Sequence, residues 1–326
     1  MFCVRIMIRL VLLYGILFIK SIAGWSDEPH MIISQIAYDI LTPHHQSILD
    51  RIFEKSYDDK LRSPIKGAVW PDAIKPIDPR RAPYQFSVRR NEILDIFNDW
   101  HYVKEPYNPT GIYLSPYDMY AHKGKNTASG ITKHIYKTLV GVGRRNLTGT
   151  YYSYNFYLRF FIHVFGDIHQ PLHTINFFNS HLTSGDKGGN LITVTFGKLV
   201  GNIHYLCDNV FNSRKKKWFN STPQDIKKLA DKLTTTYPRT LFPRQLRIPS
   251  DKVSYIDEIV SESHRLAIDY VYRQLPAPIL TKCRQFPIPK HFITQLKKIL
   301  NKQIAIAGYR LAEYLKDILD NVPSDL

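Results

Sequence analysis

The segment YSYNFYLRFFIHVFGDIHQPLH, residues 152–173, joins an apolar and aromatic run to a group of three histidines and one aspartate. The run predicts a helix near the centre of the protein. His163 and Asp167 are four residues apart, so they share one face of that helix. Pro171 ends or kinks the helix, so His173 should project from a turn with another direction.

A histidine and an aspartate on one helix face are, taken alone, more often a hydrogen-bonded surface pair than a metal site. Burial favours the metal, because an unpaired buried polar group costs about 2–7 kcal/mol. A divalent cation that is bound by neutral imidazole and carboxylate satisfies both groups. The same spacing recurs at His204 and Asp208. Two such pairs indicate a metal centre more strongly than one.

The rest of the chain has mainly helical patterns. Apolar residues recur at spacings of three and four from His30 to Leu41, and Thr42-Pro43 predicts the cap and first turn of a helix that reaches Phe53. Further helices are expected at about 127–140, 152–170, 203–211, 223–235, 251–274 and 290–319. The fold class is therefore mainly α.

Residues 190–202, NLITVTFGKLVGN, predict one small β-hairpin that turns at Gly197-Lys198. Two stretches, 76–91 and 105–125, are rich in Pro, Arg, Tyr and Asn and predict long irregular loops. The 326 residues could form one large domain or two small ones, but no change of composition marks a boundary. We expect a single multi-helix domain over residues 25–326.

Residues 1–24 predict a secretory signal peptide: Arg5 and Arg9 accompany an apolar run to Ile19, and small residues follow. The alternative is a membrane anchor, but the uninterrupted run VLLYGILFI is about half of the ~20 residues that a spanning helix needs. Glycosylation patterns begin at Asn146 and Asn220, in agreement with secretion.

The chain is strongly basic, with a formal net charge of +16 that falls to +13 when residues 1–24, with their three cations and no acid, are removed. A positive surface attracts polyanions, so nucleic acid and an anionic membrane surface are both candidate partners. A charge that serves only solubility is the alternative. Cys207 and Cys283 remain outside the leader, so at most one intrachain disulfide can form.

Seven motifs occur in an order that resembles the secreted zinc-dependent single-strand nucleases of fungi and plants, the class I nucleases, which share a fold with bacterial zinc phospholipase C. The motifs are Trp25, His30, Trp70-Pro71-Asp72, His101-Tyr102, His163 to His173, Gly188-Gly189-Asn190 and His204 to Asp208. The resemblance covers the chain from Trp25 to the C-terminal helix. It implies a phospholipase C/nuclease-type fold.

The resemblance also implies three zinc ions. The first would be bound by Asp72, His101, His163 and Asp167. The second would be bound by His173, His204 and Asp208. The third would be bound by the α-amine and carbonyl of Trp25, by His30 and by a shared oxygen of Asp167. Because a peptide nitrogen does not bind metal in this way, the third site requires cleavage between Gly24 and Trp25.

The resemblance assigns further roles. Asp72 and Lys75 would be catalytic, with Lys75 stabilising charge on the phosphate, although a solvated surface lysine is the alternative. Tyr102 would stack on an unpaired base. Asn190 would contact the nucleotide, or serve only the turn. His169 is not at a ligand position, so we expect it either to have a structural role or to support a ligand residue.

Two positions depart from the family pattern. Lys104 stands where some members have a base-binding aspartate, so base preference cannot be carried over. Cys207 replaces the usual tryptophan before the last aspartate. It could be a packing residue, half of a disulfide with Cys283 or a soft metal ligand, and we favour packing.

The expected protein is therefore a secreted, monomeric endonuclease without stable membrane insertion. It would hydrolyse single-stranded DNA and RNA to 5′-phosphate products and would also act on 3′-nucleotides. The first alternative is a zinc-dependent phospholipase C, whose pattern ends with glutamate where this chain has Asp208. The second is a binding protein that keeps the fold without activity, but all nine expected ligand positions are intact.

Overall fold

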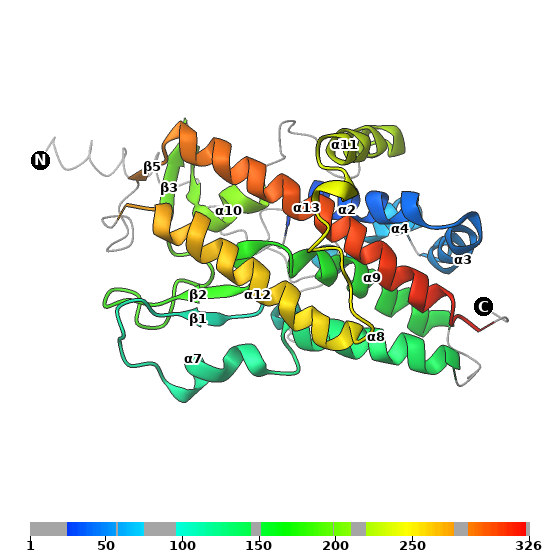
Figure 1. Cartoon of the computed structure of the whole chain (residues 1–326), viewed down its shortest axis with the longest axis horizontal. Coiled ribbons are helices and arrows are strands. Elements are labelled where there is room, and N and C mark those ends of the chain that lie inside the picture. Colours follow the sequence, from blue (N-terminus) through cyan, green and yellow to red (C-terminus); the bar gives the residue numbers. More distant parts are fainter. Residues whose placement is uncertain are drawn as a thin grey trace, which may run out of the picture.

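The computed structural model describes residues 25–56, 58–74, 96–144, 151–197, 199–209, 220–276 and 286–323. These residues form a mainly helical protein with two small sheets (Figure 1), which confirms the predicted fold class. The predicted leader, residues 1–24, lies outside the described residues. Within them, none of the helices combines the length and the apolar character that a membrane crossing requires.

Most α-helices fall on predicted segments, whereas the short helices at residues 64–67, 70–73 and 116–120 were not predicted. The α-helices are α2 (Asp27–Ile40), α3 (Pro43–Glu54), α4 (Pro64–Gly67), α5 (Trp70–Ala73), α7 (Pro116–Tyr120), α8 (Ala128–Arg144), α9 (Tyr151–Asp167), α10 (Ile203–Asp208), α11 (Pro223–Thr236), α12 (Lys252–Tyr270) and α13 (Lys290–Leu319). Short 3-10 helices lie between them: η1 (Asp59–Leu61), η3 (Asn98–His101), η4 (Ala121–Lys123), η5 (Pro171–His173), η7 (Arg239–Leu241) and η8 (Tyr272–Gln274).

The long helix α13 crosses the molecule, and α2, α8 and α9 pack against it (Figure 1). The approach of α13 to α2 depends on Gly308, because a Cβ atom there would lie only 2.6 Å from Cβ of Ile36. α9 is the central helix: every residue from Leu158 to Asp167 is buried. The second half of the aromatic run, residues 158–162, therefore builds the core, and its end delivers His163 and Asp167 to the interior.

Local chemistry sets the helix boundaries that matter for the site. Thr42 caps α3, since its side-chain oxygen accepts a hydrogen bond from the backbone N–H of His45. α9 ends at Asp167, and Pro171 opens the 3-10 turn η5. Gln170 caps that turn by accepting from the backbone N–H of Leu172 at 2.6 Å. The predicted change of direction before His173 is confirmed.

The predicted hairpin is formed by β3 (Thr193–Phe196) and β4 (Leu199–Asn202), which pair antiparallel with Val194 opposite Gly201. Gly197 takes the positive φ of +62° that the turn requires. A further strand, β5 (Phe286–Pro287), lies parallel to β3. Sequence patterns missed it because two residues carry no periodicity.

A second sheet pairs β1 (Glu105–Tyr107) parallel to β2 (Ile175–Phe177). The prediction of an irregular loop at 105–125 was therefore wrong, since this stretch contains β1, α7 and η4. Each element is at most five residues long, and β1 forms only because a segment 70 residues away provides its partner. The other predicted loop, at 76–91, lies outside the described residues.

Candidate metal centre

Three groups of histidine and aspartate side chains meet where α2, α5, α9, η3, η5 and α10 converge. The groups are His30, Asp72 and His163; His101, His163 and Asp167; and His173, His204 and Asp208. Within each group the potential ligand atoms all lie within 4.8 Å of one another. The helix periodicity explains only the pairs His163–Asp167 and His204–Asp208. Packing brings the remaining members from distant parts of the chain.

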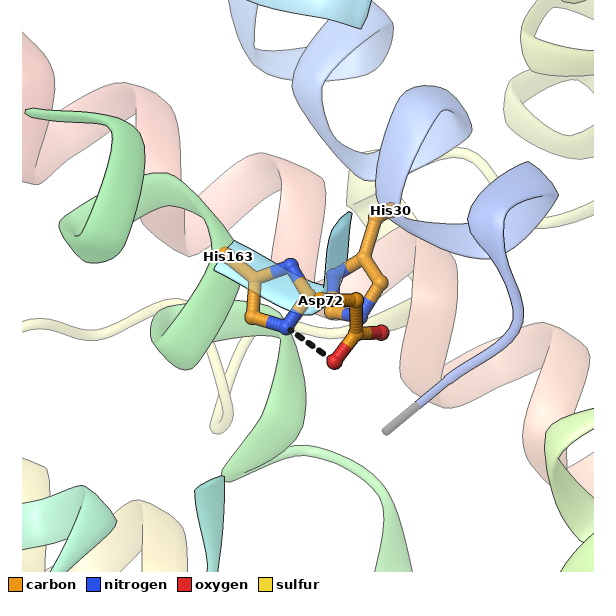
Figure 2. A group of neighbouring side chains, drawn as sticks. All are labelled: His30, Asp72 and His163. Carbon is orange, nitrogen blue, oxygen red and sulfur yellow. Dashed lines mark ion pairs between the residues drawn. The ribbon is translucent and has the colours of Figure 1, made fainter. Parts of the chain in front are cut away.

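Figure 2 shows the group formed by His30, Asp72 and His163, whose side chains point toward one another from three helices. The two imidazole rings stack with centroids 3.7 Å apart. Nδ1 of His163 lies 2.7 Å from the carbonyl oxygen of Ala68, to which it donates. This bond leaves the lone pair on Nε2, which lies 3.5 Å from a carboxylate oxygen of Asp72.

Asp167 is common to the whole centre. One carboxylate oxygen lies 2.9 Å from Nδ1 of His101 and 3.4 Å from Nε2 of His163. The other lies 3.4 Å from Nε2 of His30 and 3.3 Å from Nδ1 of His173. Burial alone would raise the pKa of Asp167, but the surrounding histidines hold it well below its usual value. The histidines around Asp167 therefore favour its carboxylate form.

The third group lies at the end of η5 and on α10. The rings of His173 and His204 stack with centroids 5.0 Å apart. Their Nδ1 atoms donate to backbone carbonyls, at 3.0 Å for His173 and 2.7 Å for His204. Their Nε2 atoms lie 3.6 and 3.4 Å from the carboxylate of Asp208. Gln170 orients this carboxylate by donating to it at 2.7 Å.

The donor atoms fit a divalent cation such as zinc. Both ring nitrogens of His30, one oxygen of Asp167 and Nε2 of His173 are buried and form no hydrogen bond. Burial lowers the pKa of His30, whereas Asp167 and Asp208 outweigh burial and raise the pKa of His173 to about 9. Buried imidazole nitrogens and carboxylate oxygens that form no hydrogen bond are the ligand atoms that zinc prefers.

Trp25 lies beside two of the groups. Its side chain is fully buried, and its indole N–H donates to the carbonyl oxygen of Gly166 at 2.9 Å. The next residue, Ser26, donates its backbone N–H to the carbonyl oxygen of Asp208 at 3.2 Å. Gly166 directly precedes the ligand position Asp167, and Asp208 is itself a ligand position. These two hydrogen bonds therefore hold the backbone of Trp25 next to the centre.

The residues predicted to contact substrate are placed differently. The ring of Tyr102 lies 5.1 Å from that of His173, at the edge of the centre. Asn190 donates to the carbonyl of Lys187 at 2.9 Å, a bond within its own turn. Lys75 lies outside the described residues. Lys104 forms an ion pair with Asp99 at 2.8 Å.

Asp186 is a site residue that the motifs did not reveal. It is buried and accepts hydrogen bonds from the backbone N–H groups of Phe177, Gly188 and Gly189 and from the hydroxyl of Tyr272. It thereby fixes the loop whose Gly188 carbonyl orients His204. Burial raises the pKa of Asp186 to about 6. Its position just before a Gly-Gly pair was the only signal in the sequence.

His169 has the structural role expected of it. It is fully buried, Nδ1 donates to the carbonyl of Phe165 at 2.8 Å, and Nε2 accepts from Arg310 at 3.2 Å. Cys207 is a free thiol in the hydrophobic core, in agreement with packing. Cys283 lies outside the described residues.

This chain is similar to known proteins over most of its length. The family model described as S1/P1 Nuclease matches residues 25–320. The chain is 28% identical to Endonuclease 4 of Arabidopsis thaliana over 304 residues, which are 92% of this chain and 90% of the relative. It is 24% identical to Nuclease S1 of Aspergillus oryzae over 304 residues, 92% and 93% of the two chains.

A solved structure, Alpha Toxin from Clostridium Absonum, aligns with a TM-score of 0.41 and 14% identity over 92% of this chain and 66% of that one.

Proposed function

The chain belongs to the S1/P1 nuclease family, and we propose that it is a zinc-dependent endonuclease for single-stranded DNA and RNA. It leaves 5′-phosphate products and also removes phosphate from 3′-nucleotides. The observation that carries this proposal is the convergence of three buried histidine–aspartate groups on Asp167. Such a centre suits hydrolysis of a phosphodiester, whose reaction develops negative charge on oxygen.

Three zinc ions would occupy the centre, with the ligands that the family resemblance implies. Ions bound there would lower the pKa of water and neutralise charge on the phosphoryl oxygens. The protein's own contribution is to fix the ligands. The rings of His163, His173 and His204 each donate a hydrogen bond to a backbone carbonyl, and Gln170 donates one to the carboxylate of Asp208. These four bonds orient the ligand atoms before a metal ion binds.

Substrate would approach at Asp72 and Tyr102. The side chain of Asp72 is 11% exposed, whereas those of His101, His163 and Asp167 are fully buried, so the centre opens on the Asp72 side. Tyr102 would stack on a base, which must be unpaired to offer its face. We propose that Lys75 stabilises charge on the phosphate and that Asn190 contacts the nucleotide.

The third ion requires a free α-amine at Trp25, and therefore removal of residues 1–24 in the secretory route. The hydrogen bonds that hold Trp25 and Ser26 beside Gly166 and Asp208 support this assignment. The mature enzyme would be secreted, monomeric and not inserted in a membrane. Its net positive charge of +13 would favour encounter with polyanionic strands.

The test is an assay of protein that begins at Trp25 and is loaded with zinc. Release of acid-soluble nucleotide is measured from single-stranded DNA, from duplex DNA and from RNA, with phosphatidylcholine hydrolysis in parallel. We expect nucleotide release from both single-stranded substrates, loss of activity with a chelator and recovery with zinc. Hydrolysis of the lipid without nucleotide release would contradict the proposal and favour a phospholipase C.

A further inference from the structure

Exposed aromatic side chains are concentrated on one short segment of the protein. Of the ten large hydrophobic side chains that are exposed in the described ranges, four lie between residues 113 and 120. Tyr113, Tyr117 and Tyr120 are 85%, 71% and 55% exposed. Tyr117 and Tyr120 are three residues apart on α7, so they share one face of that helix. Such a concentration on a small surface indicates a binding site.

The segment is held rigidly. Asn108 closes the preceding loop through two hydrogen bonds with the backbone of Ile112, at 2.7 and 3.1 Å. Ser115 caps α7 by accepting from the backbone N–H of Asp118 at 3.1 Å, and it donates to the carboxylate of Asp118 at 2.6 Å. The backbone that carries the exposed rings therefore loses little conformational freedom when something binds to them.

The segment is also continuous with the metal centre. Tyr117 lines a pocket of about 160 Å³ whose other walls include Tyr102, Lys104 and Asn126. Tyr102 borders the ring of His173. Figure 1 shows α7 beyond β1, at the edge of the molecule, and Tyr117 and Tyr120 on this helix are exposed. Tyr102 therefore connects the pocket that Tyr117 lines to the ring of His173.

We propose that Tyr117 and Tyr120 form a second base-stacking platform, which binds nucleotides of a single strand beyond the one at the metal centre. This inference rests on the proposed function and adds a subsite to it. Aromatic faces accept any unpaired base, so the platform would increase affinity for longer strands without a choice of sequence. The ammonium of Lys123 lies 5.3 Å from the ring centroid of Tyr120, and this cation–π contact would restrict the movement of that ring.

Local charges make stacking, and not phosphate attraction, the main source of affinity there. Lys104, which lines the pocket, is paired with Asp99 at 2.8 Å. Lys123 lies over the ring of Tyr120, and Asp118 lies on α7 itself. Loss of the two rings should therefore weaken binding without changing its dependence on salt, because that dependence counts phosphate contacts.

The test is binding of thymidine oligonucleotides with phosphorothioate links, which resist cleavage, to the zinc-loaded protein. Anisotropy is measured for a dinucleotide and a decanucleotide at several salt concentrations. Replacing Tyr117→Ala and Tyr120→Ala together should weaken decanucleotide binding at least about fivefold. Dinucleotide binding should change less than about twofold, and the salt slope should stay the same. The double Phe variant should bind like the unchanged protein.

Tyr152→Ala is the matched control, since Tyr152 is 80% exposed at the far end of α9 from the metal ligands. Equal weakening for both lengths, an unchanged decanucleotide affinity or an altered salt slope would each overturn the platform. If the double Ala variant lost binding to phosphatidylcholine vesicles and kept its decanucleotide binding, the platform would be overturned in favour of a lipid-binding surface. If the protein bound the decanucleotide through these tyrosines but never cleaved DNA, the platform would be supported and the proposed nuclease activity would be refuted.

Discussion

Replacing Asp167 by asparagine should remove more metal than any other single substitution of a ligand. Its two oxygens lie within 3.4 Å of nitrogens from four histidines, His30, His101, His163 and His173, so every group of the centre depends on it. Asparagine keeps the size of the side chain but loses the charge. Its NH₂ group would also point a donor at ring nitrogens that should face a cation.

The size of the effect follows from these contacts. The bond from His101 at 2.9 Å is charge-assisted, and such a bond contributes about 1.5–3 kcal/mol to stability. The metal-free variant should therefore unfold more easily by about that amount. Substitution of a residue that only orients a ligand through a hydrogen bond typically reduces metal affinity about 10–100-fold. Loss of a shared ligand should exceed the upper end of that range, and turnover should fall at least as far.

The assay combines zinc content after dialysis, hydrolysis of single-stranded DNA, and circular dichroism to verify the fold. Asp208→Asn is the comparison, because the carboxylate of Asp208 lies near the histidines of one group, His173 and His204. That variant should lose metal from one group and keep it in the others. A folded Asp167→Asn protein with normal zinc and normal turnover would refute the shared-ligand reasoning. Equal zinc loss in the two variants would refute the expectation that Asp167 matters for more of the metal than Asp208 does.

Three further predictions concern the surroundings of the ligands. One extra residue before Trp25 should remove only the third zinc, measured as metal per chain; unchanged metal and rate would show that the α-amine does not bind. Gly188→Ala should lower zinc affinity about 10–100-fold, because its Cβ would lie 2.3 Å from the carbonyl oxygen of Leu172 and shift the carbonyl that orients His204; metal titration checks this. Burial raises the pKa of Asp186 from 3.8 to about 6, so protonation stabilises the fold below pH 4, and this stabilisation, up to about 3 kcal/mol, is lost as the pH rises through 6. Asp186→Asn should lack that decline in urea unfolding between pH 4 and 7, and an identical decline would contradict the assignment.

Much of the site could be predicted from local patterns. The aromatic run predicted the central helix because burial of apolar surface favours its placement in the core. His163 and Asp167 share a face because the helix repeats every 3.6 residues, whatever surrounds it. Pro171 breaks the helix by its own ring geometry. Each of these effects acts within a few residues, so the sequence alone carries it.

Tertiary packing decided the rest. His30 and Asp72 meet His163 only because α2 and α5 pack against α9, and no spacing in the sequence encodes that contact. The β1–β2 pair and the loop held by Asp186 depend on hydrogen-bond partners far along the chain.

The sequence by itself determined a mainly helical chain with the ligand pairs and the turn that carries His173, because helix periodicity and proline geometry are local properties. Only the tertiary structure decided that these ligands join in one centre around Asp167, and that Tyr117 of α7 shares a pocket with Tyr102. Contacts between distant segments depend on how whole faces fill space and satisfy buried polar groups. Those conditions exist only once the chain has folded.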